Sequence, residues 1–537
     1  MTKTQLAMVI SIASMIVGIA ASSFYYDAQQ LGISVFLLIS LILLALFGVR
    51  QWSQLAINWR NTWLIVPILF FSAMVALRAD GYLNSINLLL VVGLGGLLVA
   101  CLRSSQMVDA MSLIEHATHE IYAVFSVGVI APLTNLTDSI KWIGGQTQAN
   151  EAQADKRRLV GGAVLRGVLL TIPILVVFGI LLGSADSVFA DGIQAILNLI
   201  TIDLDELFNR LLLACFFAWF IAGILTTALV LPPLRHAPTP PADAPSDETP
   251  PRSVGFRIGA IESSILLGSV NAMFLIFVAI QFVYLFGGNG DLSYSEYARR
   301  GFSELVLLTV LVIGLVLLMQ RITLRQTPTE TTLFYGLLTV MIGLTGVILI
   351  SAARRMGLYI EAFGYTRLRL WVSVFMPWLG LLLLILLADV YGVRKHLFSL
   401  GVLIVVMGHV GTLNLLNIDA LIAERNLTRF YSNADALEVC YLTRLSADAV
   451  PALVSLYQRV DNAELKQEVG LHLYWEQQRL ASYADSRNVT EYNRGLTLAV
   501  QALQPLTRQL EAHHEAWYNS TATFSPCDSS EVYYYDR

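Results

Sequence analysis

Long apolar runs alternate along this chain with short polar and charged connections. A run of about 18 or more apolar residues is long enough to cross a bilayer as a helix. The pattern predicts an all-α fold, a polytopic transmembrane helical bundle of about 11 spans with a C-terminal soluble helical domain. The spans are expected at residues 4–25, 31–49, 62–78, 82–102, 159–183, 207–231, 257–286, 301–320, 331–352, 371–391 and 397–416.

The first apolar run begins close to the N-terminus. The stretch "MTKTQLAMVISIASMIVGIAASSF" has one lysine followed by a long, mostly apolar run. This run is longer than the apolar core of a signal peptide, although "AAS" near Ala21 resembles a cleavage site. We therefore expect an uncleaved first span.

Composition agrees with a membrane protein. The chain has 537 residues, of which 56% are hydrophobic and only 14% are charged, and its net charge is −5. Soluble domains carry roughly 25% charged residues. The lipid bilayer is thus the expected partner. No basic patch with interleaved aromatic residues is present, so a nucleic-acid partner is not expected.

Breaks between the apolar runs divide the chain into six expected regions. The segment 104–158 is too polar for simple spans and has apolar residues near helical spacing, which is typical of a helix lying on the membrane face. The stretch "HAPTPPADAPSDETPPR" predicts a flexible linker. The expected regions are a four-span membrane region at 1–103, a cytoplasmic or interfacial amphipathic segment at 104–158, a two-span region at 159–235, a Pro-rich cytoplasmic linker at 236–256, a five-span region at 257–416 with an interfacial helix at 354–370, and an extracytoplasmic helical domain at 417–537.

Lysine and arginine gather in alternate connections, as in proteins that follow the positive-inside rule. This bias predicts a multi-pass protein of the cell (plasma or inner) membrane, with a cytoplasmic N-terminus and an extracytoplasmic C-terminal domain. The cytoplasmic side then holds, among others, Lys3, Arg50, Arg60, Arg103, Lys156, Arg235, Arg321, Arg325 and Arg394.

The most charged connection is "SAARRMGLYIEAFGYTRLRLW", between two apolar runs. Its apolar residues repeat at three- and four-residue steps, so a helix here would have one apolar face and could rest at the membrane surface. Alternatively, the arginines form a polar site that clamps an anionic headgroup or a carboxylate. The candidate binding residues in this stretch are Arg354, Arg355, Glu361, Tyr365, Arg367 and Arg369.

Ionisable residues within or next to spans supply the other candidates. Arg300 and Glu304 are four residues apart and would share a helix face, and Glu304 is expected to be a buried, partnered carboxylate. Glu262 in a span and Asp186 in an extracytoplasmic connection are further ligand-binding candidates. The stretch "EHATHE" differs from the HExxH order of zinc proteases, so we expect a solvated helix face and no metal or other cofactor.

Residues 417–537 are more polar, and their apolar residues follow helical steps. This pattern predicts three or four amphipathic helices in a small bundle, and a protein partner could bind through them. If this domain is extracytoplasmic, Cys440 and Cys527 are a candidate disulfide.

Several separated motifs resemble a known family. "LYIEAFGYTRLRLWVSVFMPWLG", "YSEYARRGFSELV", "LLGSADSVFAD" and "NIDALIAERNLTRF" occur in the order found in bacterial polytopic membrane proteins classed as domain of unknown function 4173, with a sibling 4153. The resemblance covers roughly residues 160–460. It implies a polytopic membrane protein, and it implies no reaction, ligand or catalytic residue.

Motifs of common enzymes do not help to assign an activity. The chain has no P-loop, dinucleotide-binding, kinase or haem-attachment motif. The leading hypothesis is a membrane scaffold or sensor-type component that binds a partner or an envelope ligand at its extracytoplasmic face. The alternatives are a transporter or permease for a small or lipidic solute, and a membrane enzyme acting on lipid or cell-wall precursors.

Overall fold

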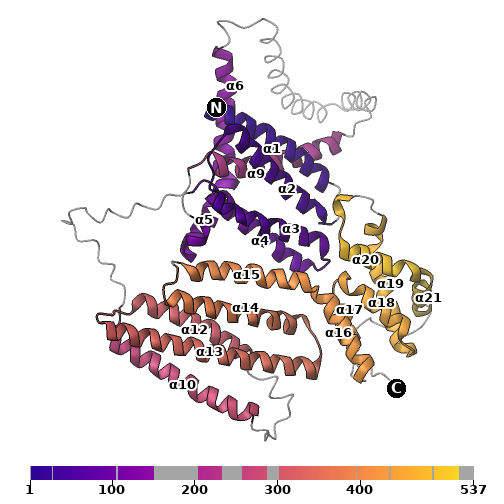
Figure 1. The fold of residues 1–537 in the computed structure, drawn as a ribbon. Helices are drawn as coiled ribbons and strands as arrows, with labels where there is room; N and C mark the ends of the chain where they lie inside the picture. Colours follow the sequence, from indigo (N-terminus) through magenta and orange to yellow (C-terminus); the bar gives the residue numbers. More distant parts are fainter. Residues whose placement is uncertain are drawn as a thin grey trace, which may run out of the picture.

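The structure is a computed structural model that describes residues 2–26, 28, 30–104, 107–149, 204–232, 257–286, 302–394, 396–433, 437–485 and 489–518. Long helices dominate these residues, and most of them run side by side (Figure 1). The membrane region contains α1 (Lys3–Tyr25), α2 (Ile33–Ser53), α3 (Ile65–Leu77), α4 (Gly81–Cys101), α5 (Leu113–Phe125), α6 (Ala131–Ala149), α9 (Leu204–Leu229), α10 (Ala260–Phe286), α12 (Phe302–Ile322), α13 (Pro328–Phe363), α14 (Arg367–Val390) and α15 (Leu397–Leu416).

Eleven helices of the described part are long and apolar enough to cross a membrane. Ten of them coincide with expected spans, which confirms the helical membrane fold. The expected span at 159–183 lies outside the described residues. The eleventh candidate is instead Leu113–Ile143, inside the segment that we expected to lie on the membrane face.

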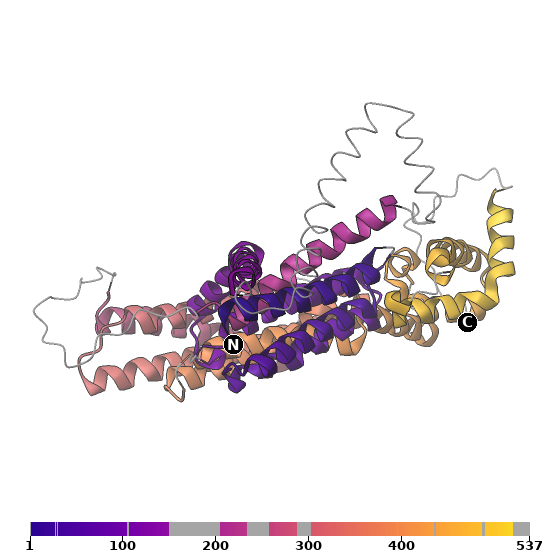
Figure 2. The same cartoon turned by 90° about the horizontal axis from the view of Figure 1, so that it is seen from above.

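That additional helix runs in a different direction from its neighbours. α5 and α6 join through a π-helical turn, η3 (Ser126–Ile130), into one continuous rod. This rod crosses the direction of the other spans in Figure 1 and is seen end-on in Figure 2. Polar contacts hold it in place, since Ser126 hydroxyl lies 2.8 Å from that of Thr227 and Ser139 hydroxyl lies 3.0 Å from that of Ser11. Its location on the membrane face stays a prediction, which the crossing direction supports.

The charged connection does not form a helix of its own. α13 continues without interruption from Pro328 to Phe363, and residues 367–370 are the first turn of α14. The chain turns only at Gly364, where φ is +76°, a conformation that residues with a Cβ rarely adopt. Thr366 then caps α14 by accepting a hydrogen bond from the Arg369 N–H. The expectation of a separate helix at 354–370 was therefore wrong.

Two apolar cores lie side by side. The first joins α1–α4 and α9, and the second joins α10 and α12–α15. The tail packs at one end of the first group, and its buried side chains continue that core (Figure 1). The tail consists of α16 (Ile418–Asn433), α17 (Val439–Thr443), η4 (Ala447–Ala449), α18 (Val450–Arg459), α19 (Ala463–Asp485), η5 (Val489–Glu491), α20 (Arg494–Leu503), η6 (Gln504–Leu506) and α21 (Thr507–Tyr518).

Candidate functional site: a polar junction between spans and tail

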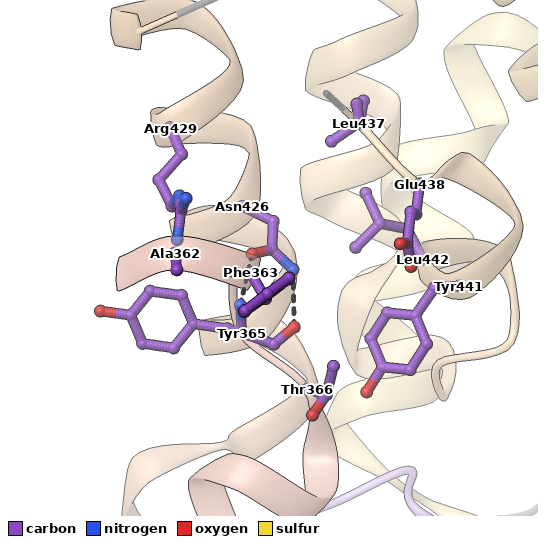
Figure 3. Close-up of a pocket in the computed structure, with 11 residues that line it drawn as sticks. Ala362, Phe363, Tyr365, Thr366, Asn426, Arg429, Leu437, Glu438, Tyr441 and Leu442 are labelled. Carbon is purple, nitrogen blue, oxygen red and sulfur yellow. Dashed lines mark hydrogen bonds between the residues drawn. The ribbon is translucent and has the colours of Figure 1, made fainter. Parts of the chain in front are cut away.

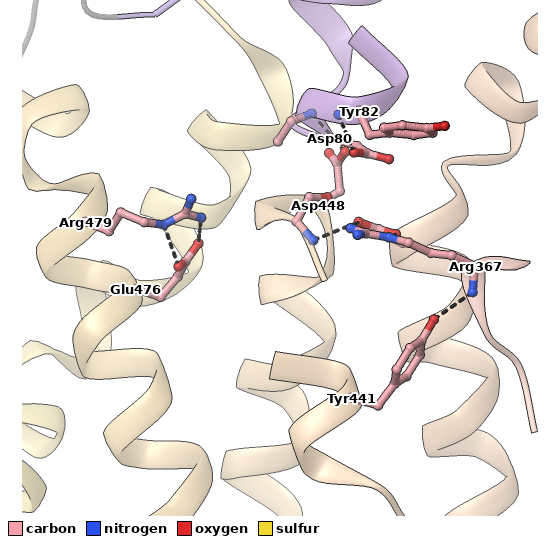
Figure 4. A network of polar contacts seen from close by, with 10 residues as sticks. Asp80, Tyr82, Arg367, Tyr441, Asp448, Glu476 and Arg479 are labelled. Atoms are coloured by element: carbon pink, nitrogen blue, oxygen red, sulfur yellow. Dashed lines mark hydrogen bonds and ion pairs between the residues drawn. The ribbon is translucent and has the colours of Figure 1, made fainter. Parts of the chain in front are cut away.

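Three turns meet where the tail joins the membrane region. They are the α3–α4 turn, the α13–α14 turn and the segment before η4. We call the charged residues brought together there the polar junction (Figure 4). It consists of Arg78, Asp80, Arg367, Asp419 and Asp448.

The centre of the polar junction is the ion pair between Arg367 and Asp419. Arg367 Nε donates to Asp419 Oδ1 at 2.7 Å, and its Nη2 donates to the second carboxylate oxygen, so the pairing is bidentate. Asp419 also accepts a hydrogen bond from the Ser446 backbone N–H at 2.7 Å. Its side chain is only 1% exposed, whereas that of Arg367 is 38% exposed. The pair therefore ties the first turn of α14 to α16 and to the segment before η4.

The Tyr441 hydroxyl also fixes the first turn of α14. The Arg367 backbone N–H donates to the Tyr441 hydroxyl at 2.6 Å. Nearby, the Asn426 side chain pairs with the Tyr365 backbone on both sides, accepting from its N–H at 2.8 Å and donating to its carbonyl at 2.9 Å (Figure 3). Side chains of α16 and α17 thus hold the backbone of the α13–α14 turn.

Asp448 links the tail to the α3–α4 turn. Its Oδ2 accepts a hydrogen bond from the Ala79 N–H at 2.9 Å. Burial raises the pKa of Asp448 to about 6; Arg78 opposes that rise, whereas Asp419 and Asp80 reinforce it. Asp448 also packs closely against Gly495 of α20, where a Cβ would lie 2.2 Å from Asp448 Oδ1.

Asp80 lies on the membrane side of the junction. It precedes α4 and accepts a hydrogen bond from the Tyr82 N–H at 2.9 Å, as a helix N-cap does. Burial raises the pKa of Asp80, the neighbouring Asp419 adds to the rise, and Arg367 counteracts it. Three carboxylates and two guanidinium groups therefore share one partly buried site.

A cavity of about 780 Å³ opens beside these charges. Asp80 and Arg367 line it from the membrane region, and Arg444, Glu476 and Arg479 line it from the tail. Glu476 and Arg479 form a bidentate pair, in which the glutamate is 9% and the arginine 62% exposed. A smaller cavity of about 330 Å³ lies on the other side of the α13–α14 turn, next to Tyr365 and Asn426 (Figure 3).

The structure separates the candidates of the charged connection. Arg367 belongs to the polar junction. Arg369 instead stacks on the Tyr359 ring at 4.2 Å and donates to the carbonyls of Phe363 and Gly364, each at 2.7 Å. Glu361 and Arg354 are exposed, and Arg355 is partly buried, away from the two cavities. These residues therefore do not form one clamp.

Two of the span carboxylates are not buried. Glu304 is exposed at the start of α12 and accepts a hydrogen bond from the Ser303 hydroxyl at 2.8 Å, so the prediction of a buried, partnered carboxylate was wrong. Glu262 is exposed in the first turn of α10 and accepts from the Gly259 N–H at 2.7 Å, which is a capping contact. Arg300 and Asp186 lie outside the described residues.

The cysteine and histidine candidates have ordinary contacts. Cys440 Sγ lies 3.6 Å from Glu468 Oε1, and Cys527 lies outside the described residues, so the disulfide stays a prediction. His119 is buried, and its Nδ1 lies 2.8 Å from the Glu115 carbonyl, which corrects the expectation of a solvated face. Within the described part of the chain, no group of three or more His, Cys, Asp or Glu residues could hold a metal ion.

Sequence reasoning missed the three aspartates of the junction. Asp80 could have been recognised in "RADGY", because an aspartate directly before an apolar run is a typical helix N-cap. Asp419 follows the last span within three residues, on the side to which Arg367 was assigned. Asp448 gives no such signal, because its partner Ala79 is far away in the sequence.

Apolar helices of spanning length, joined by polar turns, define this chain as an integral multi-pass membrane protein. A family model described as "Domain of unknown function (DUF4153)" matches residues 65–456, more than half of the chain. The protein therefore belongs to this family, which confirms the resemblance through the sibling 4153. The match begins at α3, well before residue 160. No curated protein and no solved structure matches the chain.

Proposed function

We propose that this protein is a scaffold or sensor-type component of the plasma (inner) membrane, which binds an anionic envelope ligand at the polar junction. The observation that carries the proposal is the combination of the partly buried Arg367–Asp419 pair, which ties the tail to the spans, with the cavity of about 780 Å³ beside it. A ligand in this cavity contacts the spans and the tail at once.

The charges that line the cavity favour an anion. Asp80 is engaged as a helix cap, and Glu476 is engaged by Arg479. Arg444 is exposed at the cavity, and its guanidinium makes no hydrogen bond or ion pair within the described residues. The spare binding capacity is therefore cationic, which suits a carboxylate or a phosphate group.

Binding at this position can act on the tail. A ligand shifts a conformational equilibrium only if it binds one state better than the other. A phosphate held between Arg444 of the tail and the α3–α4 turn would favour the docked tail over an undocked one. This coupling is what a sensor of an envelope component requires.

The distribution of arginines supports an extracytoplasmic junction. Eight cationic residues of the described membrane region lie at helix ends opposite to the junction: Lys3, Arg50, Arg60, Arg103, Arg257, Arg321, Arg325 and Arg394. Six lie at the junction end: Arg78, Arg210, Arg354, Arg355, Arg367 and Arg369. Such an excess of cationic residues is typical of cytoplasmic ends. The N-terminus is then cytoplasmic, and the polar junction and the tail are extracytoplasmic.

Thermal melting of the purified full chain, with sn-glycerol 3-phosphate as the probe, tests the proposal. The probe should raise the melting temperature of the wild-type protein, because it binds only the folded state. Arg444→Gln should abolish this rise, because it removes the guanidinium that binds the phosphate. The variant should still fold, since Arg444 is exposed and its loss leaves no buried partner. Arg459→Gln, a change at an exposed arginine of the same domain, is the matched control and should keep the rise. A wild-type melting temperature that the probe does not change would contradict an anion site of this chemistry.

A further inference from the structure

An apolar pocket with a single carboxylate lies in the membrane region, outside the polar junction. It has a volume of about 330 Å³ and is lined by side chains of α2, α3, α4, α5, η3 and α9. Glu120 of α5 is its one ionisable lining residue. The lining also includes Val92 and Val124, which are 67% and 65% exposed, so the pocket reaches the outer surface of the helix bundle.

The carboxylate of Glu120 lies against Gly96 of α4, where a side chain would collide with it. A Cβ built on Gly96 of α4 would lie 2.4 Å from Glu120 Oε2. Within the described residues, no hydrogen bond or ion pair reaches this carboxylate. A partly buried carboxylate in apolar surroundings is costly unless a cation or a hydrogen-bond donor satisfies it. A cation or hydrogen-bond donor from outside the described residues would satisfy this carboxylate.

The depth of the pocket indicates what kind of molecule fits. Gly96 lies five residues before the end of α4 at Cys101, which at 1.5 Å per residue is about 8 Å inside the helix end. Ile39 lies 14 residues before the end of α2 at Ser53, which is about 21 Å from the same end. The pocket thus has its carboxylate near headgroup depth and its apolar part toward the middle of the bilayer, as the shape of a lipid requires.

We propose that this pocket binds one membrane lipid with a primary-amine headgroup. The ammonium donates hydrogen bonds to Glu120, and an acyl chain lies against α2 and α4. A primary ammonium carries three N–H donors, whereas a choline headgroup has none and a glycerol headgroup adds no positive charge beside its phosphate. Charge complementarity therefore selects the amine-headed class.

Native mass spectrometry of the purified full chain provides the test. Phosphatidylethanolamine and phosphatidylglycerol with identical acyl chains are added separately, and the retained lipid is counted. The wild-type protein should retain phosphatidylethanolamine about tenfold better, the size expected for one charge-assisted hydrogen bond. Glu120→Gln should remove this preference. Glu361→Gln, a change at an exposed carboxylate away from the pocket, should leave it unchanged.

A second variant tests the apolar part of the pocket independently. Gly95 lines the pocket, and a Cβ built on it has no heavy atom within 4 Å, so Gly95→Leu adds apolar volume to the cavity. It should reduce retention of both lipids, whereas Gly48→Leu on α2, also in open space, should not. Equal retention of the two lipids by the wild type, a preference that survives Glu120→Gln, or unchanged retention in Gly95→Leu would each overturn the proposal.

Discussion

Replacing Asp448 by asparagine should change how strongly the tail is docked as a function of pH. Burial raises the pKa of this carboxyl from its ordinary value of 3.8 to about 6. A raised pKa means that the folded protein holds the proton more tightly than the unfolded chain does. The charged carboxylate is therefore a destabilising element above pH 6, and the cost disappears as the pH falls through 6 toward 4.

The size of the effect follows from the shift. A difference of about 2 pKa units corresponds to about 3 kcal/mol between the protonated and charged forms. The asparagine side chain can still accept the hydrogen bond from Ala79 and carries no charge. The pKa of about 6 already includes the attraction to Arg78. Burying the asparagine NH2 group costs part of the gain, so we expect Asp448→Asn to stabilise the docked tail by about 1–2 kcal/mol at pH 8.

Hydrogen exchange of the full chain, with rates corrected for intrinsic pH dependence, measures local opening at α18 and α20. In the wild type, the opening free energy should be higher at pH 5 than at pH 8. In Asp448→Asn this difference should shrink. Asp80, whose pKa is also raised by burial, favours the folded state at low pH, whereas His472 and His513, whose pKa values are lowered by burial, oppose it equally in both proteins. Asp461→Asn, at an exposed acid of the tail, is the control and should keep the wild-type difference. The reasoning is refuted if Asp448→Asn shows the same pH difference as the wild type.

Three further predictions concern the junction and its side of the membrane. Arg367→Gln leaves Asp419 buried without its cation and should weaken tail docking by about 2–3 kcal/mol. The loss is smaller than for a fully buried pair because Arg367 is 38% exposed. Faster hydrogen exchange in α16 checks this prediction, and the charge-swapped double variant should recover part of the loss. Gly364→Ala forces a Cβ onto a φ of +76° and should lower the melting temperature, whereas an alanine at a helical glycine with open space should not. In a cysteine-free background, an impermeant maleimide added to intact cells should label Glu361→Cys and spare Gln51→Cys; the reverse pattern would invert the proposed orientation.

The membrane helices could be predicted from the sequence because the signal is local. A long apolar run has few alternatives to a spanning helix, so ten expected spans match described helices. The end of α13 was harder to predict. Both Gly357 and Gly364 interrupt the charged connection, and only the tertiary contact of Gly364 with Asn426 shows which of them ends the helix.

The polar junction could be predicted only in part. Arg367 was a candidate because of its unusual charge between apolar runs. Its partner Asp419 is 52 residues away, and Asp448 meets Ala79 across 369 residues, so no local pattern contains these pairs. The pocket at Glu120 could not be predicted for the same reason. It forms where α5 crosses α4 at Gly96, and the periodicity within α5 does not indicate the direction of this crossing.

The length of α13 has a consequence for the end of the bundle opposite to the polar junction. Its 36 residues form a rod of about 54 Å, roughly 24 Å longer than the hydrocarbon core of a bilayer. Unless the helix tilts strongly, several turns must stand clear of the lipid tails. The Thr339 hydroxyl lies 2.8 Å from that of Tyr391, just past the end of α14, so the 11 residues of α13 before Thr339 extend beyond α14 at the end away from the tail (Figure 1). The tail docks at the other end, where helices of ordinary spanning length stop, since α4 has 21 residues and α15 has 20. The protruding turns therefore place the α12–α13 connection, and not the tail, farthest from the lipid tails.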